Sequence, residues 1–329
     1  MRRREFITLL GGVAAAWPVT ARAQQRALPV VGFISGRSPD DSARPGAAFR
    51  AGLSESGIID GQTATVDYHW LDGQFDQLPA LVADLVRRHV AVIVTPGIGA
   101  AALVAKSATK TIPIVFGVGQ DPVQLGLVAS LARPGGNVTG INFFASEVVS
   151  KQLGLLHELA PKAVRLAVLV NPSNGITVEY TLRDIREAAP ALGLKIQVIE
   201  VTSVGEIDAL SGTFAHERPD ALFVGPDAFL FSRRVQLAIL AARHGIPTMA
   251  GNDREGVEAG GLMSYGTGGT DMYRQVGAYA GRILKGAKPG DLPVQQSTKF
   301  EFAINVSTAK VLGLDVPPAL LLRADAVIE

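Results

Sequence analysis

The sequence predicts an α/β protein with two similar Rossmann-like lobes, each built on a mostly parallel sheet. Short apolar runs of strand character alternate with amphipathic helical segments along most of the chain. The second half of the chain repeats the order of elements in the first half. The 329 residues, of which 47% are hydrophobic and 19% charged, are enough for two domains of ordinary size.

The first 23 residues are predicted to be an export signal and not part of the fold. Three arginines precede a mildly apolar run over residues 6–19, and Ala21-Arg22-Ala23 has the small-x-small pattern that places cleavage after Ala23. The apolar run is too short to span a membrane. Residues 3–7, RREFI, fit the twin-arginine pattern, and an ordinary secretory signal with extra arginines is the alternative. We expect a periplasmic mature protein.

Charge and cysteine content exclude several classes of function. The signal segment holds four Arg and one Glu, so its removal changes the formal net charge from +1 to about −2. This balance argues against a polybasic nucleic-acid-binding surface. The chain has no Cys, which excludes disulfides, thiolate metal sites and lipid attachment through cysteine. We expect a monomer without metal or cofactor.

Strands and helices of the first half follow from apolar periodicity and from turn residues. Leu78, Leu81, Val82 and Leu85 have helical i, i+3, i+4, i+7 spacing, and Asp121-Pro122 is typical of a helix start. The predicted strands cover residues 28–35, 64–70, 90–95, 112–116 and 138–144. The predicted helices cover residues 42–56, 75–89, 97–109 and a short segment from 121 to the Arg133-Pro134 stop.

The second half repeats this plan. Helices are predicted at residues 146–159, 176–192, 204–216, 230–244, 270–284 and 307–312, and strands at 164–170, 194–201, 221–224, 246–249, 261–265 and 299–305. Residues 92–96 lead through a helix to Thr111-Ile112-Pro113, just as residues 222–226 lead through a helix to Gly245-Ile246-Pro247. The repeat favours two similar lobes. The Pro317-Pro318 tail has no predicted element.

A ligand cleft is predicted between the lobes. In open α/β sheets ligands bind beyond the carboxyl ends of the strands. The loops at these ends cover residues 35–37, 70–73, 95–99, 117–121, 171–175, 225–229 and 250–254. Two lobes that face each other would bring these loops together around a small solute.

One loop also matches a dinucleotide-binding fingerprint. Gly97-Ile98-Gly99 and Ala102 fit G-x-G-x-x-A between a strand and a helix, and Asp121 follows about 20 residues later. The match lies in the third βα unit and not the first, and Asp121 lies beyond a glycine loop. An exported NAD(P)-dependent oxidoreductase is therefore the alternative function. The backbone N–H groups of the same loop would also suit a carboxylate.

Other candidate residues have both a structural and a functional interpretation. Asp121, Asp227 and Asp253 follow predicted strands and either cap helices or contact a ligand. Trp70 and Tyr265, near strand ends, are candidates for covering an apolar ligand. The G-x-S-x-G, P-loop and H-E-x-x-H motifs do not occur, and the five histidines stand singly, so catalysis is not predicted.

Several stretches in order make the chain resemble one known family. They are RRREFITLLGG, LPALVADLVRRHVAVIVTPG, IPIVFGVGQDPVQLGLVASLARPGGNVTG, LVNPSN, FVGPDAF, AARHGIPTMA, EAGGLMSYG, YRQVGAYAGRILKGAKPGDLPVQQ and KFEFAINVSTAKVLGL. Together they cover nearly the whole chain. The chain is similar to the tryptophan/tyrosine-type substrate-binding proteins of ABC transporters, which have the type I periplasmic binding protein fold.

The resemblance implies capture of a small solute between two lobes and its delivery to a membrane permease. It also implies three hinge crossovers, placed near residues 142–146, 265–270 and 292–298. The first lobe would then comprise residues 27–143 and 268–291, and the second residues 144–267 and 292–329. A binding protein that passes its ligand to a receptor kinase is a further alternative.

The resemblance also assigns ligand-facing positions. They fall on Ser35, Thr95, Gly97, Ile98, Gly119, Asp121, Asn142, Asn171, Ser173, Asn174, Asp227 and Asp253, to which the aromatic candidates Trp70 and Tyr265 are added. Relatives often have hydroxyl residues where this chain has Pro96-Gly97-Ile98. With Thr95 the one hydroxyl there, we expect either an amino-acid-like solute or a small carboxylated or aromatic one.

Overall fold

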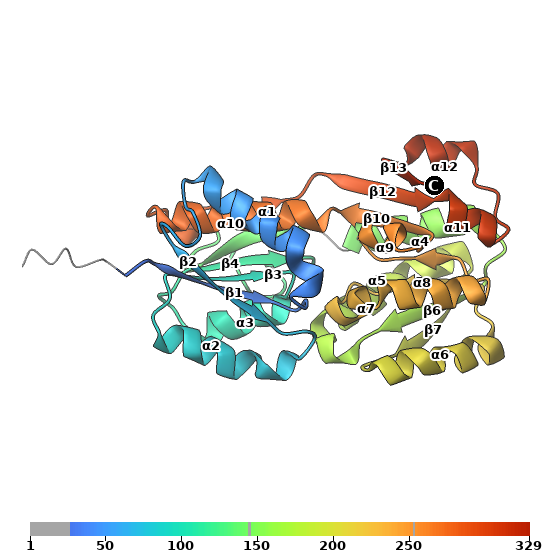
Figure 1. Cartoon of the computed structure of the whole chain (residues 1–329), viewed down its shortest axis with the longest axis horizontal. Helices are drawn as coiled ribbons and strands as arrows, with labels where there is room; N and C mark the ends of the chain where they lie inside the picture. Colours follow the sequence, from blue (N-terminus) through green and yellow to red (C-terminus); the bar gives the residue numbers. More distant parts are fainter. Residues whose placement is uncertain (1–26, 144–145, 253) are drawn as a thin grey trace, which may run out of the picture.

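Two sheets with the same strand order form the two lobes of the protein (Figure 1). The computed structural model describes residues 27–143, 146–252 and 254–329. Within these residues, one sheet has six strands in the order β11-β5-β4-β3-β1-β2 and the other has seven in the order β13-β12-β10-β9-β8-β6-β7. If β11 is left out of the first sheet and β12 and β13 out of the second, the orders are β5-β4-β3-β1-β2 and β10-β9-β8-β6-β7. Successive strands of the chain then take the same positions in both sheets. The predicted fold class is confirmed.

The first lobe is a parallel sheet with helices on both faces. Its strands are β1 (Val30–Ser35), β2 (Thr65–Trp70), β3 (Val92–Pro96), β4 (Ile114–Val118), β5 (Val138–Asn142) and β11 (Gln295–Gln296). Helices α1 (Ala43–Glu55) and α10 (Gly269–Leu284) pack on one face, and α2 (Leu78–Arg87) and α3 (Gly99–Ala108) pack on the other. Short 3-10 helices lie at Asp40–Ser42, Phe75–Gln77 and Pro289–Asp291.

The second lobe has the same layers. Its strands are β6 (Arg165–Val170), β7 (Lys195–Glu200), β8 (Ala221–Val224), β9 (Thr248–Met249), β10 (Met263–Thr267), β12 (Phe300–Asn305) and β13 (Ala326–Ile328). Only the β10–β12 pair is antiparallel among the described strands. Its helices are α4 (Ser146–Leu159), α5 (Gly175–Ala188), α6 (Val204–Glu217), α7 (Ala228–Ser232), α8 (Arg234–Arg243), α9 (Arg254–Glu258), α11 (Val306–Val311) and α12 (Pro318–Arg323), with 3-10 turns at Pro172–Asn174 and Ala189–Leu192.

The chain passes between the lobes after β5, after β10 and after β11. The first two passages fall within the predicted ranges 142–146 and 265–270. The third falls at residues 297–299, because Gln295 and Gln296 still pair with β5 in the first sheet. Residues 292–296, which the sequence analysis placed in the second lobe, therefore end the first sheet.

The helix predicted from Asp121 to Arg133 is wrong. Residues 122–126 form turns, with the Leu127 N–H donating to Pro122 O at 2.8 Å. Gly126 has a positive φ of 69°, which ends the helical path after one turn. Asp121-Pro122 does begin one helical turn, but Gly126 in the left-handed region ends it there.

Several element boundaries also differ from the prediction. The predicted helix 230–244 is two helices, α7 and α8, which meet at Arg233. The 3-10 turn Ala189–Leu192 ends α5 as its proline required. Strands β11 and β13 and helices α9 and α12 were missed because each has six residues or fewer and little apolar periodicity. In α12, the second proline of the predicted tail occupies the first helical position.

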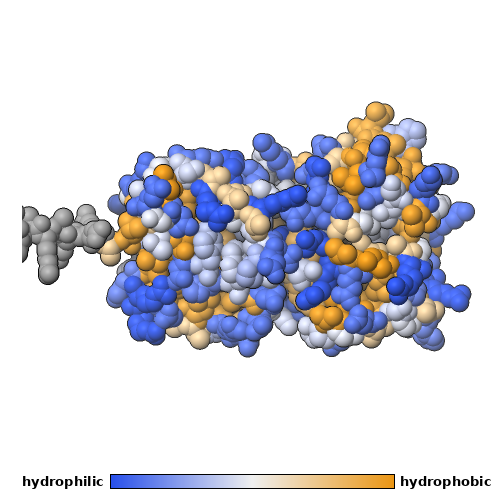
Figure 2. Space-filling model, in the orientation of Figure 1, coloured by the Kyte–Doolittle hydropathy of each residue, from blue (hydrophilic) through white to orange (hydrophobic). Residues whose placement is uncertain are grey.

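The surface over the C-terminal elements is partly apolar. In Figure 2 an apolar patch lies at the upper right, over α12, where the Leu322 side chain is 87% exposed. No described helix has both the length and the apolar composition that crossing a membrane requires. The export signal predicted at residues 1–23 lies outside the described residues.

Helices α1 and α10 approach each other through glycines, although more than 200 residues separate them in the chain. A Cβ on Gly52 would lie 1.8 Å from Arg274 O, and a Cβ on Gly277 would lie 2.2 Å from Phe49 O. Neither contact leaves room for a methyl group, and both involve backbone atoms that cannot rotate away. The return of α10 to the first lobe therefore depends on these small residues.

We expect Gly277→Ala to lower the free energy of unfolding by about 2 kcal/mol or more, because the added methyl group forces two backbones apart. Gly212 is the matched control, since it lies exposed on α6 with open space around its Cβ position. Gly212→Ala should raise stability by about 0.5–1 kcal/mol through helix propensity. Urea denaturation of the chain from residue 24 measures both. Equal stability of the two variants would contradict the packing argument.

Candidate ligand-binding cleft

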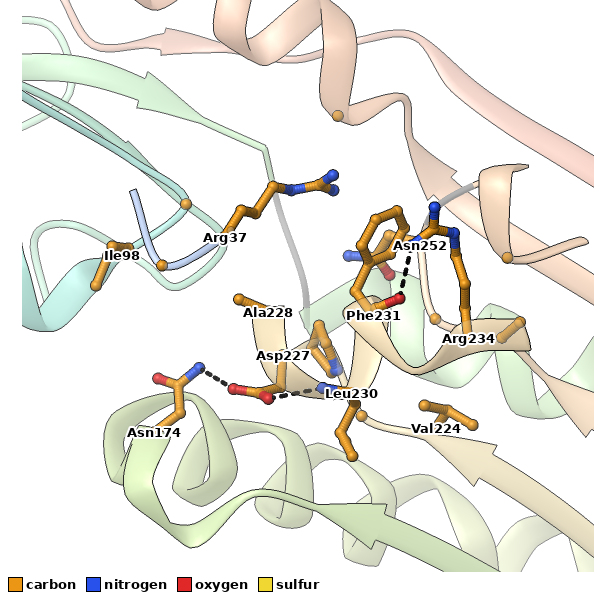
Figure 3. Close-up of a pocket in the computed structure, with 18 of the residues that line it drawn as sticks. Arg37, Ile98, Asn174, Val224, Asp227, Ala228, Leu230, Phe231, Arg234 and Asn252 are labelled. Atoms are coloured by element: carbon orange, nitrogen blue, oxygen red, sulfur yellow. Dashed lines mark hydrogen bonds between the residues drawn. The ribbon is translucent and has the colours of Figure 1, made fainter. Parts of the chain in front are cut away.

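A cavity lies between the lobes, where strands of both sheets end. It contains about 1210 Å³ of space outside protein atoms, part of it open to solvent. Ser35 lines it from the first lobe. Figure 3 shows Ile98 of the first lobe opposite Val224, Asp227 and Asn252 of the second. Because residues of both lobes form its walls, a solute bound here would contact both lobes at once.

The first-lobe wall offers backbone and hydroxyl groups. Ser35 is buried at the end of β1, with its Oγ 3.5 Å from the Tyr273 hydroxyl. Gly97 has a positive φ of 82°, and its N–H donates to Gly117 O at 2.8 Å. Ile98 then adopts an extended conformation before α3, and no described side chain caps this helix start. The wall thus carries the positive end of a helix dipole.

Apolar side chains supply much of the remaining surface. Phe75, Ile98, Leu237 and Met272 line the cavity. Met272 reaches it because Gly117 leaves space, since a Cβ at Gly117 would lie 2.5 Å from the Met272 Sδ. Methionine adapts to irregular apolar shapes, so this part of the cavity suits an apolar solute body.

Asp227 is the partly buried centre of a hydrogen-bond network on the second-lobe wall. Its Oδ1 accepts from the N–H groups of Phe229 at 2.9 Å and Leu230 at 3.1 Å, which caps α7. Asn171 Nδ2 donates to the same oxygen at 3.1 Å, and Asn174 Nδ2 donates to Oδ2 at 3.2 Å. Burial raises the pKa of the Asp227 carboxyl, although these donors favour its charged form. The carboxylate is therefore largely satisfied within the protein.

A cluster of charged and aromatic groups joins the lobes at one side of the cavity. Arg234 of α8 donates to Asp41 of the first lobe, with 2.7 Å between Nη1 and Oδ1. The guanidinium carbons of Arg37 and Arg234 lie 4.0 and 4.4 Å from the centroid of the Phe231 ring. Arg37 and Asp41 belong to the first lobe and Phe231 and Arg234 to the second, so the Arg37–Phe231 contact and the Asp41–Arg234 pair bridge the cleft. We call these four residues the Phe231 clasp.

Two further contacts connect the lobes outside this cluster. Arg44 of α1 lies 3.3 Å from a carboxylate oxygen of Glu258 on α9, with the Arg44 side chain 68% exposed. Gln120 Nε2 donates to Thr177 Oγ1 at 3.3 Å. The lobes therefore touch through side chains from three separate places, which is a closed arrangement.

Five residues expected from the sequence to contact a ligand line the cavity. They are Ser35, Gly97, Ile98, Asn174 and Asp227. Asn171 lies behind these residues, and its side-chain amide donates a hydrogen bond to the Asp227 carboxylate. Contact of these residues with a solute stays a prediction, and their position is compatible with it.

Other expected contacts in the first lobe lie away from the cavity. The Trp70 ring packs 5.3 Å from the Phe33 ring in the core beside α1. Thr95 and Gly119 are buried, and Asn142 Nδ2 donates to Gln120 O at 2.6 Å. Asp121 is exposed, and its Oδ1 accepts from the N–H groups of Val123 and Gln124.

In the second lobe, Ser173 is exposed and its N–H donates to Asn171 Oδ1 at 3.1 Å. The Tyr265 ring stacks on the Phe300 ring, with 5.8 Å between their centroids. Neither lines the cavity. Asp253 lies outside the described residues.

Sequence reasoning missed most of the side chains that come from helices. Phe231, Arg234, Met272 and Tyr273 line the cavity from α7, α8 and α10. The polar and glycine-rich patterns lie in loops after strands, and these residues lie one or two helical turns further on. The sequence offered one signal for the residues on α10, which was the second predicted crossing. Residues that follow a crossing between the lobes must lie near the cleft.

Comparisons with known proteins agree on one family. The family model described as "ABC transporter substrate binding protein" matches residues 28–328. The "Tyrosine-binding protein" of Clostridioides difficile (strain R20291) is 27% identical over 277 residues, which is 83% of this chain and 77% of that protein.

Solved structures extend the likeness to three dimensions. A substrate-binding ABC domain in complex with L-Trp from Streptococcus pneumonia aligns with a TM-score of 0.79 at 26% identity, over 92% of this chain and 100% of that chain. A ligand-free, open substrate-binding protein with adhesive properties from Clostridium difficile aligns with a TM-score of 0.63 at 25% identity, over 92% and 99% of the two chains. The score is thus lower with the structure described as open and ligand-free than with the L-Trp complex.

We expect Asp121→Ala to leave solute affinity unchanged and to lower the free energy of unfolding by about 0.5–1 kcal/mol, because the carboxylate accepts two backbone N–H groups outside the cavity. Thermal unfolding and calorimetric titration of the same preparation measure the two effects. A large loss of affinity without loss of stability would instead assign Asp121 to the ligand.

Asp41→Asn is expected to weaken solute binding about three- to tenfold, or about 1 kcal/mol, because the pair with Arg234 forms only when the lobes meet. Asp41 does not line the cavity, so the change acts on closure and not on ligand contact. Glu258→Gln removes a more exposed charge that also bridges the lobes, and it should change affinity less than twofold. Equal effects of the two substitutions would contradict a special role for the clasp.

Proposed function

The chain belongs to the ABC transporter substrate-binding protein family, and from this premise we propose that its solute is an aromatic amino acid or a closely related aromatic carboxylate. As a substrate-binding protein it takes up a small solute between its two lobes for an ABC permease. The proposal concerns the chemical class of that solute.

The observation that carries the proposal is the composition of the cavity wall. Its apolar part, with Phe75, Ile98 and Met272, suits a planar or aliphatic solute body. Among the described lining residues the charged side chains are Arg37, Arg234 and Asp227. Two guanidinium groups against one carboxylate give these lining residues a formal charge of +1, with Arg234 also paired to Asp41 just outside the cavity. A positive wall favours a solute that carries a carboxylate.

The relatives support the aromatic part of the proposal. One is a tyrosine-binding protein, and one structure holds L-Trp. Both align with most of this chain at 26–27% identity. The lack of side-chain hydroxyls at residues 96–98 leaves room for differences within the class, including a solute without an ammonium group.

We also propose that the protein is exported through its twin-arginine signal, cleaved after Ala23, and works as a periplasmic monomer. The signal pattern at residues 3–7 and the family support this location. A monomer suffices because both walls of the cavity come from one chain.

The dinucleotide fingerprint has a structural explanation. The N–H of Gly97 is already bonded to Gly117 O, and a Cβ at Gly99 would lie 3.3 Å from the Gln120 side chain. Gly97 allows the positive φ of 82° at the end of β3, and Gly99 allows close packing of α3 against the loop after β4. The matched family is one of solute-binding proteins and not of enzymes, and transport is favoured over oxidoreductase chemistry.

The expected result is that L-tyrosine, L-tryptophan or their deaminated acids raise the melting temperature of the chain from residue 24 onward. A ligand at 100 times its Kd adds about 2.7 kcal/mol to stability, which corresponds to a shift of several degrees in a protein of this size. Branched aliphatic amino acids and aromatic amines serve as controls. The aromatic carboxylate class is wrong if only the controls shift the melting temperature.

A further inference from the structure

The carboxamide of Asn252 is held in one orientation at the wall of the cavity (Figure 3). Its Oδ1 accepts a hydrogen bond from Gln152 Nε2 at 2.8 Å. Its side chain packs closely on Gly266, where a Cβ would lie 2.7 Å from the Asn252 Cβ. The Asn252 side chain therefore lies between the Gln152 amide and the backbone of Gly266, which leaves little space for a second rotamer.

Gln152 imposes this orientation from a fully enclosed position. Its side chain is only 1% exposed, and its Nε2 also lies 2.6 Å from Tyr265 O and 3.2 Å from Gly251 O. Backbone carbonyl oxygens accept hydrogen bonds and cannot donate them, so a nitrogen must stand at this place. The carbonyl of Tyr265 therefore fixes the polarity of the Gln152 amide. The second N–H of Nε2 donates to Asn252 Oδ1 at 2.8 Å and shares the longer contact with Gly251 O, and this bond fixes the polarity of the Asn252 amide.

With its Oδ1 bonded to Gln152, the Asn252 carboxamide can offer a solute its Nδ2, which is a hydrogen-bond donor. Among the described residues, none accepts a hydrogen bond from its Nδ2. An amide nitrogen carries two N–H groups and no lone pair for acceptance. The solute atom that meets it must be an acceptor, and the positive balance of charge on the same wall favours a carboxylate oxygen over a neutral carbonyl.

The geometry points to Asn252 Nδ2 as a donor to the carboxylate of the bound solute, with Gln152 as the positioning residue that holds this donor in place. This assignment rests on the proposed function, because it presupposes a carboxylate-bearing solute. Gln152 lies on α4, just after the first crossing, and Tyr265 lies on β10, just before the second. The donor is thereby attached to the segments that lead into two hinges.

Three probes of similar shape test the assignment: L-tyrosine, 3-(4-hydroxyphenyl)propionate, which lacks the ammonium group, and tyramine, which lacks the carboxylate. Titration calorimetry of the chain from residue 24 gives their affinities. Asn252→Asp keeps the oxygen that accepts from Gln152 and replaces the donor by a second oxygen. It should weaken binding of both acids tenfold or more, and it should change tyramine binding less than twofold or improve it.

Gln152→Met keeps the length of the side chain and removes the donor. We expect it to weaken binding of both acids by nearly as much as Asn252→Asp does. In the double variant the loss should equal that of Asn252→Asp alone, because Gln152 acts through Asn252. Asn137→Asp is the matched control, since the Asn137 amide donates to Thr109 O and Ile112 O in the first lobe, away from the cavity. It should lower stability and leave affinity unchanged.

Each contrary outcome overturns a distinct statement. Affinity of Asn252→Asp for the acids within twofold of the parent overturns the donor assignment. A Gln152→Met variant that melts earlier but binds the acids like the parent, or losses that multiply in the double variant, overturn the positioning role. A parent chain that binds none of the three probes overturns the proposed solute class, and this assignment with it.

Discussion

The close approach of α1 and α10 is the constraint on which the cleft depends. Helix α10 follows β10 of the second sheet and must return to the first lobe, where Gly52 and Gly277 let the two helix backbones touch. This docking fixes the start of α10 at the cleft and so delivers Met272 and Tyr273 to the cavity. A larger residue at either glycine would lift α10 from the sheet and shift the second crossing together with the cavity wall.

The two walls contribute different chemistry because different kinds of structure build them. The first lobe presents the end of β1 and the start of α3, so its polar groups are a buried hydroxyl, backbone N–H groups and the guanidinium of Arg37. The second lobe presents side-chain amides and carboxylates that hold one another, in the Asp227 network and in the Gln152–Asn252 pair. Discrimination among related solutes therefore depends chiefly on second-lobe side chains, which other side chains orient.

The sequence was sufficient to predict the fold, since periodicity and turn residues located most strands and the shared strand order. It failed where a local signal was overruled or absent: Gly126 ended the helix expected after Asp121, and the two residues of β11 carry no apolar pattern. For the site, loops at strand ends correctly led to Ser35, Ile98 and Asp227 at the cavity. Helical residues such as Phe231 and Met272 needed the packing of the lobes, which no local pattern encodes.

Closure of the cleft has to be both favourable and reversible, and the cross-lobe contacts suit this requirement. The pair of Asp41 with Arg234 is partly exposed, with side chains 17% and 25% accessible, and such pairs contribute about 1 kcal/mol or less. Stacking of the Arg37 guanidinium on Phe231 across the cleft adds a similar amount. Contacts of this size shift a two-state equilibrium without locking it, so a solute that touches both walls decides which state is populated. A stronger clasp would close the empty protein and exclude the solute, and a weaker one would hold a bound solute less tightly.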